Sequence, residues 1–236
     1  MVSFPYALSE SPLPAMGLIV LQVDETIEHE FHRSIPPEVA RLHVSRVPSG
    51  DDLTPASIAA MEQNLTAAAA LLPPAAHFDV VGYACTSGTA QIGADRVRDL
   101  ITAGTSTRAV TDPLTAALAA LKERGAKRVG IVSPYLATVA EPLRRAFVDR
   151  GIDVPDMLSF GEEVEARVAR IDPRSIAEAA RALASGTDLD AIFLSCTNLR
   201  TQDILADLES ELEIPVLSSN QALAWHMSRL AGVPPD

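Results

Sequence analysis

The chain contains two cysteines, Cys85 and Cys196, and each ends a similar stretch of sequence. In both stretches an aspartate, Asp79 or Asp190, precedes a Cys-Thr pair by six positions, and the residues between are mostly apolar. A short apolar run bounded by turn signals is typical of a buried strand. Each thiol is therefore expected where a strand ends, which is where open α/β sheets place their chemistry.

Two thiols that face one another could move protons without a cofactor. A thiol at a strand-to-helix turn lies near the N–H groups of the helix N-terminus, so we expect a lowered thiol pKa. One thiolate could remove a proton beside a carboxylate while the other thiol returns one on the opposite face. Alternatively, one thiolate adds to an activated double bond and the other thiol transfers a proton. Neither scheme uses a metal or an organic cofactor, and we expect none.

The repeat around the cysteines extends through much of the chain. Residues 17–22 (GLIVLQ) match residues 130–135 (GIVSPY), which puts Gln22 and Tyr135 at equivalent positions. A lone buried cysteine is most often a small hydrophobe, but recurrence at equivalent repeat positions favours catalysis. We expect Cys85 and Cys196 to face each other across a cleft, with Gln22 and Tyr135 at its mouth.

Strand-like runs alternate with alanine-rich helical stretches, a pattern typical of parallel sheets with crossover helices. The expected strands are 17–22, 41–47, 79–85, 107–111, 127–133, 190–196 and 214–218. The prediction is an α/β fold of two similar Rossmann-like (flavodoxin-like) lobes with parallel sheets, related by a pseudo-twofold axis, with the active site in the cleft between them. Residues 1–113 and 219–236 would form the N-terminal lobe, and residues 114–218 the C-terminal lobe.

Local signals place several helix ends. Thr54 followed by Pro55 predicts an N-cap with proline at the first helical position. Helices over 114–124 and 173–185 should end at Gly125 and Gly186. A last helix over 220–229 should return to the first lobe.

Composition and charge narrow the class of protein. The chain has 236 residues, 47% of them hydrophobic, and a formal net charge of −12. This charge argues against a nucleic-acid or anionic-membrane partner, because both attract clustered Lys and Arg. Neither a signal peptide nor an apolar run long enough for a membrane helix is seen, so we expect a cytoplasmic protein with reduced thiols. A homo-oligomer is compatible with the sequence.

One acidic and histidine-rich stretch superficially resembles a metal site. Residues 28–32 read Glu-His-Glu-Phe-His, and His29 and His32 could share a helix face. No third ligand with a familiar spacing follows. We expect a solvated charged helix face here and no metal.

The segments around both cysteines resemble the aspartate/glutamate/hydantoin racemase superfamily. The resemblance rests on residues 82–88 (GYACTSG), 193–198 (FLSCTN) and 133–135 (SPY), and it covers essentially the whole chain. The nearer branch contains maleate cis-trans isomerase and arylmalonate decarboxylase. The resemblance implies that Cys85 and Cys196 are catalytic and that five residues hold a substrate carboxylate: Thr86, Ser87, Tyr135, Thr197 and Asn198.

Two positions depart from the pattern of maleate isomerase. The best matches to two substrate-contacting asparagines of that enzyme are acidic here, Asp24 and Glu165. Carboxylates in these places would repel a dianion at short range. The departures therefore favour a substrate with one carboxylate and a cationic or polar second end.

These observations lead to one main interpretation and two alternatives. The main one is a cofactor-independent isomerase, a racemase or epimerase or a cis-trans isomerase, that uses Cys85 and Cys196 on a small carboxylic acid. The first alternative is an arylmalonate-type decarboxylase with Cys196 as the proton donor. The branch's decarboxylase has glycine at the place of Cys85, so the presence of this cysteine argues against simple decarboxylation. The second alternative is a non-catalytic module that binds a small ligand.

Overall fold

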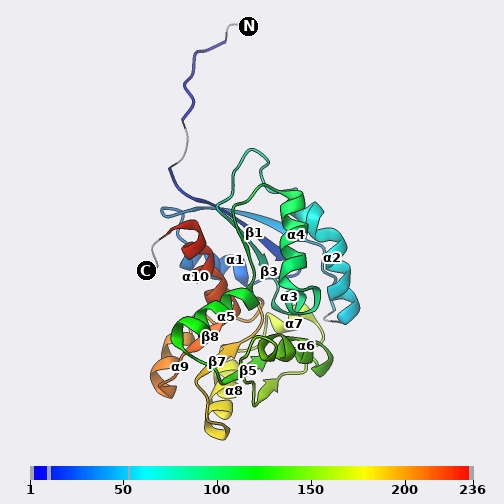
Figure 1. Ribbon diagram of the computed structural model, residues 1–236, viewed down its shortest axis with the longest axis vertical. Helices are drawn as coiled ribbons and strands as arrows, with labels where there is room; N and C mark the ends of the chain where they lie inside the picture. The colour runs from blue at the N-terminus through cyan, green and yellow to red at the C-terminus, as the bar shows by residue number, and fades with distance from the viewer. Residues whose placement is uncertain (1–2, 10–11, 53, 234–236) are drawn as a thin grey trace.

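Two parallel four-stranded sheets form the framework of the protein (Figure 1). The computed structural model describes residues 3–9, 12–52 and 54–233. The first sheet has the order β2-β1-β3-β4 and the second the order β6-β5-β7-β8. The strands are β1 Ala15–Leu21, β2 Arg41–Val47, β3 Val80–Ala84, β4 Val110–Thr111, β5 Val129–Ser133, β6 Met157–Ser159, β7 Ala191–Leu194 and β8 Val216–Ser218. The strand order is the same in both halves of the chain, which confirms the predicted fold of two similar α/β lobes.

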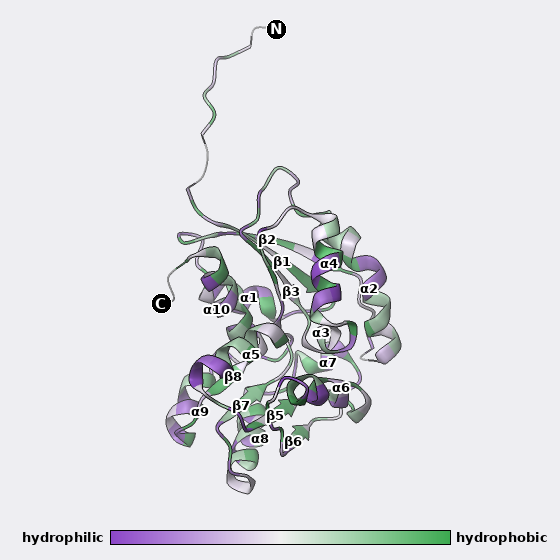
Figure 2. Cartoon of the chain, in the orientation of Figure 1, coloured by the Kyte–Doolittle hydropathy of each residue, from purple (hydrophilic) through white to green (hydrophobic). Residues whose placement is uncertain are grey.

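Helices cover both faces of the first sheet. One face packs against α1 (Ile27–Ser34) and α10 (Ser219–Ala231) through an apolar cluster that includes Leu18, Phe31 and Met227. The other face packs against α2 (Pro55–Ala69) and α4 (Ala94–Gly104). The hydropathy colouring shows the central strands as mostly apolar and the surrounding helices as a mixture of polar and apolar residues (Figure 2), as expected for buried parallel strands.

The second sheet is covered in the same way. The helices around it are α5 (Pro113–Arg124), α6 (Ala137–Val148), α7 (Glu165–Val168), α8 (Pro173–Gly186) and α9 (Leu205–Leu212). The helices α5 and α6 pack against one face of the second sheet, in an apolar cluster with β5 and β7. The helices α8 and α9 pack against the opposite face, in a second apolar cluster. This second cluster continues into the first lobe and contains both cysteines and Tyr135. The two thiols therefore lie within an apolar interior that joins the lobes.

Most of the predicted element ends agree with the structure. Thr54 caps α2 in a capping box with Ser57, and Gly125 ends α5 with a left-handed φ of 69°. Two predictions were wrong in detail. The short edge strand β6 was not foreseen, and α8 continues through Gly186, so that Thr187 is its C-cap. A three-residue strand is too short to show a period.

The last helix links the halves of the molecule. The helix α10 contacts β1 and β3 of the first sheet and the helix α1 that covers this sheet. It also contacts α5, which covers the second sheet. The division into residues 1–113 with 219–236 and residues 114–218 stays a prediction. In the described part of the chain, no helix combines the length and the apolar character that a bilayer crossing requires.

Candidate active site

The ends of four strands converge between the two sheets. The loop after β1 carries Asp24, and Cys85 follows β3 directly. In the second half, Tyr135 follows β5 and Cys196 follows β7. In each sheet these two strands are neighbours from which the chain continues in opposite directions, the point where parallel sheets bind ligands. The loops after these four strands therefore supply four of the predicted site residues, Asp24 and Cys85 from the first sheet and Tyr135 and Cys196 from the second.

Cys85 is the N-cap of the short helix α3 (Thr86–Ile92). Its Sγ accepts the backbone N–H of Gly88 at 3.2 Å and lies 3.7 Å from the Ser87 hydroxyl. A Cβ on Gly88 would come within 2.6 Å of the Tyr83 hydroxyl and 2.8 Å of Sγ, so only glycine fits here. Burial nevertheless raises the pKa of the Cys85 thiol to about 11, although the Gly88 N–H and the Ser87 hydroxyl oppose the rise.

Cys196 occupies a strained turn. Its φ is 151°, in a region that residues with a side chain seldom adopt. Its Sγ accepts the Asn198 N–H at 3.4 Å. Burial, with the nearby charge of Glu165, raises the thiol pKa well above its usual value, and the Tyr135 hydroxyl opposes the rise. The predicted lowering of the thiol pKa is therefore wrong for both cysteines in this conformation. Loss of solvent outweighs the N-terminus of α3 at Cys85, and a turn rather than the predicted helix follows Cys196.

A hydroxyl pair ties the two cysteine loops together. The backbone N–H of Cys196 donates to Ser219 Oγ at 3.0 Å, and this oxygen shares a 2.8 Å hydrogen bond with the hydroxyl of Thr86. The Thr197 hydroxyl reaches across to the carbonyl of Ala84 at 3.3 Å. The residues that follow the two thiols are thus hydrogen-bonded across the interface between the sheets.

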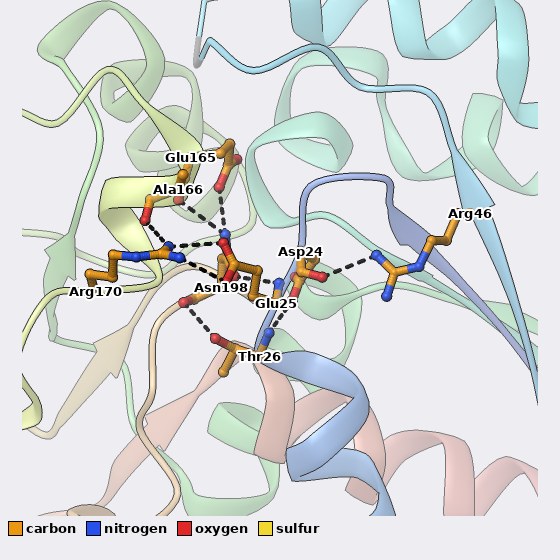
Figure 3. A network of polar contacts seen from close by, with 8 residues as sticks. All are labelled: Asp24, Glu25, Thr26, Arg46, Glu165, Ala166, Arg170 and Asn198. Atoms are coloured by element: carbon orange, nitrogen blue, oxygen red, sulfur yellow. Dashed lines mark hydrogen bonds and ion pairs between the residues drawn. The ribbon is translucent and has the colours of Figure 1, made fainter.

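Asn198 connects three segments (Figure 3). Its Oδ1 accepts the N–H of Glu25 at 2.9 Å, and its carbonyl accepts the Thr26 hydroxyl at 3.0 Å. Its Nδ2 donates to Glu165 Oε2 at 3.0 Å and to the Glu165 carbonyl at 3.2 Å. The Asn198 amide is fully engaged within the protein, so the predicted contact with a substrate carboxylate would require these bonds to exchange.

Asp24 and Glu165 are both buried, each 5% exposed. Asp24 Oδ1 accepts the N–H groups of Thr26 and Ile27 at 2.8 and 2.9 Å, at the start of α1. Asp24 Oδ2 has no hydrogen-bond partner among the described residues. Burial raises the pKa of Glu165 to about 7, and the charge of Asp24 adds to the rise. Neither carboxylate forms an ion pair with a described residue, and the nearby Arg46 and Arg170 bind Glu28 and Glu25.

The cleft opens to solvent beside Glu165. A pocket of about 490 Å³ is lined by Gln22, Val23, Glu25, Asp51, Val164, Glu165 and Ala166. Gln22 is exposed at this opening, as predicted, but Tyr135 is only 2% exposed and lies deep beside the thiols. The prediction that Tyr135 lies at the cleft mouth is therefore wrong. Neither cysteine lines the pocket, so both thiols are closed off from it in this conformation.

The remaining predicted residues lie at the thiols, each less than a twentieth exposed: Thr86, Ser87, Thr197 and Asn198. Sequence reasoning missed Tyr83 and Ser219, which touch the cysteine loops. Tyr83 precedes Cys85 by two positions and so shares its side of the strand. Ser219 gives no local signal, because its partners lie 23 and 133 residues away.

Glu30 corrects the prediction for residues 28–32. It is 5% exposed, and its two oxygens accept the N–H groups of Thr201 and Gln202 and the Asn220 amide, at 2.8 to 3.1 Å. The expected solvated face holds for His29 and His32, which are exposed. Glu30 follows Ile27 by three positions, so the two lie on the buried side of α1. Within the described residues, no cluster of His, Cys, Asp and Glu is arranged to hold a metal ion.

Comparison with known proteins identifies relatives along the whole chain. An arylmalonate decarboxylase of Bordetella bronchiseptica is 33% identical over 119 residues, half of each chain. A maleate isomerase of Pseudomonas putida is 27% identical over 93% of this chain and 92% of its own. The crystal structure of the maleate isomerase Iso from Pseudomonas putida S16 superposes with a TM-score of 0.84, at 25% identity and 94% coverage of both chains.

The family profile described as arylmalonate decarboxylase matches residues 52–236, which include both cysteines and every strand from β3 onward. The resemblance inferred from the cysteine segments is confirmed. This chain belongs to the arylmalonate decarboxylase family, whose structural relatives include the maleate isomerases.

Proposed function

We propose that this protein is a two-cysteine isomerase that acts on a small carboxylic acid without a metal or an organic cofactor. The observation that carries the proposal is the joining of the two cysteine loops by Ser219 and Thr86 at equivalent ends of the two sheets. Similarity to maleate isomerases over more than nine-tenths of the chain supports isomerisation. The reduced thiols that this chemistry needs are typical of the cytoplasm, which we propose as the location.

The two thiols can divide the reaction between them. In a cis-trans isomerisation, one thiolate adds to a carbon of the double bond, and the electron pair moves toward the substrate carboxylate. The other thiol protonates the adjacent carbon. After rotation about the resulting single bond, its thiolate takes this proton back and the first thiolate leaves with the electron pair of the C–S bond, which gives the trans product. In a racemisation, one thiolate takes the proton beside the carboxylate, and the other thiol returns a proton on the opposite face. The cis-trans cycle returns both sulfurs to their starting states. Racemisation leaves the two sulfurs with exchanged protonation states, which proton exchange with water or the reverse reaction resets.

Substrate binding must change the state of the thiols. Both are neutral in the closed, ligand-free site because burial raises the pKa of each sulfur. The donors that favour a thiolate are already in place, namely the N–H groups of Gly88 and Asn198 and the hydroxyls of Ser87 and Tyr135. We therefore expect the thiolate to form once the cleft has opened and a substrate has entered.

The proposal is tested by replacing each cysteine in turn. Proton NMR in heavy water would follow maleate and a panel of chiral amino, N-acylamino and hydroxy acids. We expect Cys85→Ala and Cys196→Ala to fold normally, by circular dichroism, and each to lose turnover by about 10²- to 10⁴-fold, the usual contribution of a positioned acid or base. Full activity in either folded variant would exclude the two-thiol mechanism.

Decarboxylation by Cys196 alone is the second candidate, and the family match and the 33% identical relative favour it. In this case Cys196 would protonate the intermediate left by loss of carbon dioxide, and Cys85 would have no chemical role. Carbon dioxide release from an arylmalonate that persists in Cys85→Gly and is lost in Cys196→Ala would support this candidate over the isomerase.

A further inference from the structure

We propose that the site selects an acid with one carboxylate whose other end donates hydrogen bonds, as an amide or an ammonium group, and that Asp24 and Glu165 recognise this donor. The inference rests on the proposed function and names its class of substrate. A second carboxylate at the same place would be rejected.

The first observation is the unpaired oxygen of Asp24. Oδ1 is held by two backbone N–H groups, so the orientation of the carboxylate is fixed. Oδ2 is buried and accepts no hydrogen bond within the described structure. The adjacent Thr197 hydroxyl lowers the pKa of Asp24, against the rise caused by burial, but the hydrogen bond it forms goes to the Ala84 carbonyl at 3.3 Å. A buried carboxylate oxygen without a donor is costly, and an N–H group of a ligand would satisfy it.

The second observation is the position of Glu165. One of its oxygens, Oε2, accepts from Asn198, and Glu165 lines the pocket that opens to solvent. The charges of Asp24 and Glu165 act on each other, and both act on the Cys196 thiol. The two carboxyl groups are therefore near each other and near the Cys196 thiol, and Glu165 also borders the pocket. A donor that reached both would hold the substrate next to Cys196.

The third observation is that the charged groups of this pocket are acidic. Its charged lining residues are Glu25, Asp51 and Glu165. Arg170 is held by both oxygens of Glu25, at 2.9 and 3.1 Å. Arg46 is bound to Glu28 and to the main-chain carbonyls of Leu21, Gln22 and Asp24. A second substrate carboxylate would meet acids here, and the nearest guanidinium groups are already paired.

The test compares maleate with maleamate, an acid of the same shape in which one carboxylate is an amide. Isomerisation of each is followed by NMR at about pH 8, above the pKa of Glu165, where a carboxylate is most strongly repelled. We expect the wild-type protein to favour maleamate in kcat/KM by at least about 10-fold. Asp24→Asn and Glu165→Gln should each move this ratio at least about 10-fold toward maleate.

The matched control is Glu163→Gln, which removes the same charge from an exposed neighbour of Glu165. This variant should keep the wild-type ratio. Preference of the wild-type protein for maleate would overturn the inference while leaving the isomerase proposal intact. An unchanged ratio in both Asp24→Asn and Glu165→Gln would also overturn it.

Calorimetric binding of saturated acids separates the inference from the proposed reaction. Succinamate and 4-aminobutanoate present an amide and an ammonium group, whereas succinate presents a second carboxylate. We expect at least one of the first two to bind at least about 10-fold more tightly than succinate. This result, without turnover of either alkene, would uphold the substrate class and reject the cis-trans reaction. Equal or tighter binding of succinate, or no binding of any of the three, would reject the substrate class.

Discussion

Glu165 illustrates how a single buried carboxyl group couples folding to pH. Its folded-state pKa is raised from 4.5 to about 7, chiefly by burial. Between these values the folded protein holds a proton that the unfolded chain has lost. The contribution of Glu165 to the free energy of unfolding therefore falls as pH rises through this interval, and it stays at its lowest above it. The same loss of solvent, applied to thiols, keeps Cys85 and Cys196 neutral.

We expect Glu165→Gln to reduce this pH dependence. Its amide oxygen can still accept from Asn198 Nδ2, but the group no longer titrates. Chemical denaturation at about pH 5 and about pH 8 should show a smaller fall in unfolding free energy than in the wild type, by up to roughly 3 kcal/mol. The variant Glu163→Gln serves as the control for the loss of one negative charge. Parallel pH profiles for wild type and Glu165→Gln would contradict the buried, titrating state of Glu165.

The short helix α7 and the loop before α2 close the cleft together. Residues Asp52 and Val164 form an isolated antiparallel bridge, and the N–H of Glu165 donates to the Asp51 carbonyl at 3.1 Å. The Arg170–Glu25 ion pair joins the end of this segment to the loop after β1. Because neither thiol lines the open pocket, we infer that these contacts must separate before a substrate reaches Cys85 and Cys196.

We expect Arg170→Ala to make the thiols more accessible. Loss of the ion pair with Glu25 removes one of the contacts that keep the segment closed, so the thiols should react faster with iodoacetamide, by about two- to five-fold for an exposed pair. Arg167→Ala is the matched control, because Arg167 pairs with Glu162 within the same segment. Equal alkylation rates in the wild type and both variants would show that the ion pair does not limit opening.

The raised thiol pKa values also change how alkylation should be interpreted. With the lowered thiol pKa that the sequence predicts, rapid alkylation near neutral pH would distinguish a catalytic pair from a mere binding cleft. Buried neutral thiols alkylate slowly in either case, since the thiolate is the reactive form. Slow alkylation of the ligand-free protein therefore does not favour the binding module, and turnover is the measurement that separates the two.

The N-terminal segment extends away from the body of the molecule (Figure 1). Phe4, Tyr6 and Leu8 alternate along it and are 84–89% exposed. Large apolar side chains gathered on an exposed segment are typical of an interaction surface. The homo-oligomer considered from the sequence stays a prediction, and this segment is the part of the structure that would contribute to it.

We expect removal of residues 1–9 to lower the mass of the particle in solution. Light scattering after size-exclusion chromatography should give an oligomer for the full chain and a smaller species for the truncated one. Phe4→Ser combined with Leu8→Ser tests the apolar side chains without changing the length. A monomer for the full chain would contradict the prediction, as would the same number of subunits in all three proteins.

Local patterns in the sequence were enough to predict most of the strands, several helix ends and the two cysteines at equivalent strand ends. Apolar runs, prolines, glycines and the Cys-Thr repeat act over a few residues, so these elements could be predicted without knowledge of their neighbours. The burial of Glu30 and Tyr135, the rise of both thiol pKa values and the Ser219 bridge could not. Each depends on groups that are distant in sequence and come together only when the two sheets pack, because solvent exclusion and long-range hydrogen bonds are properties of the assembled interior.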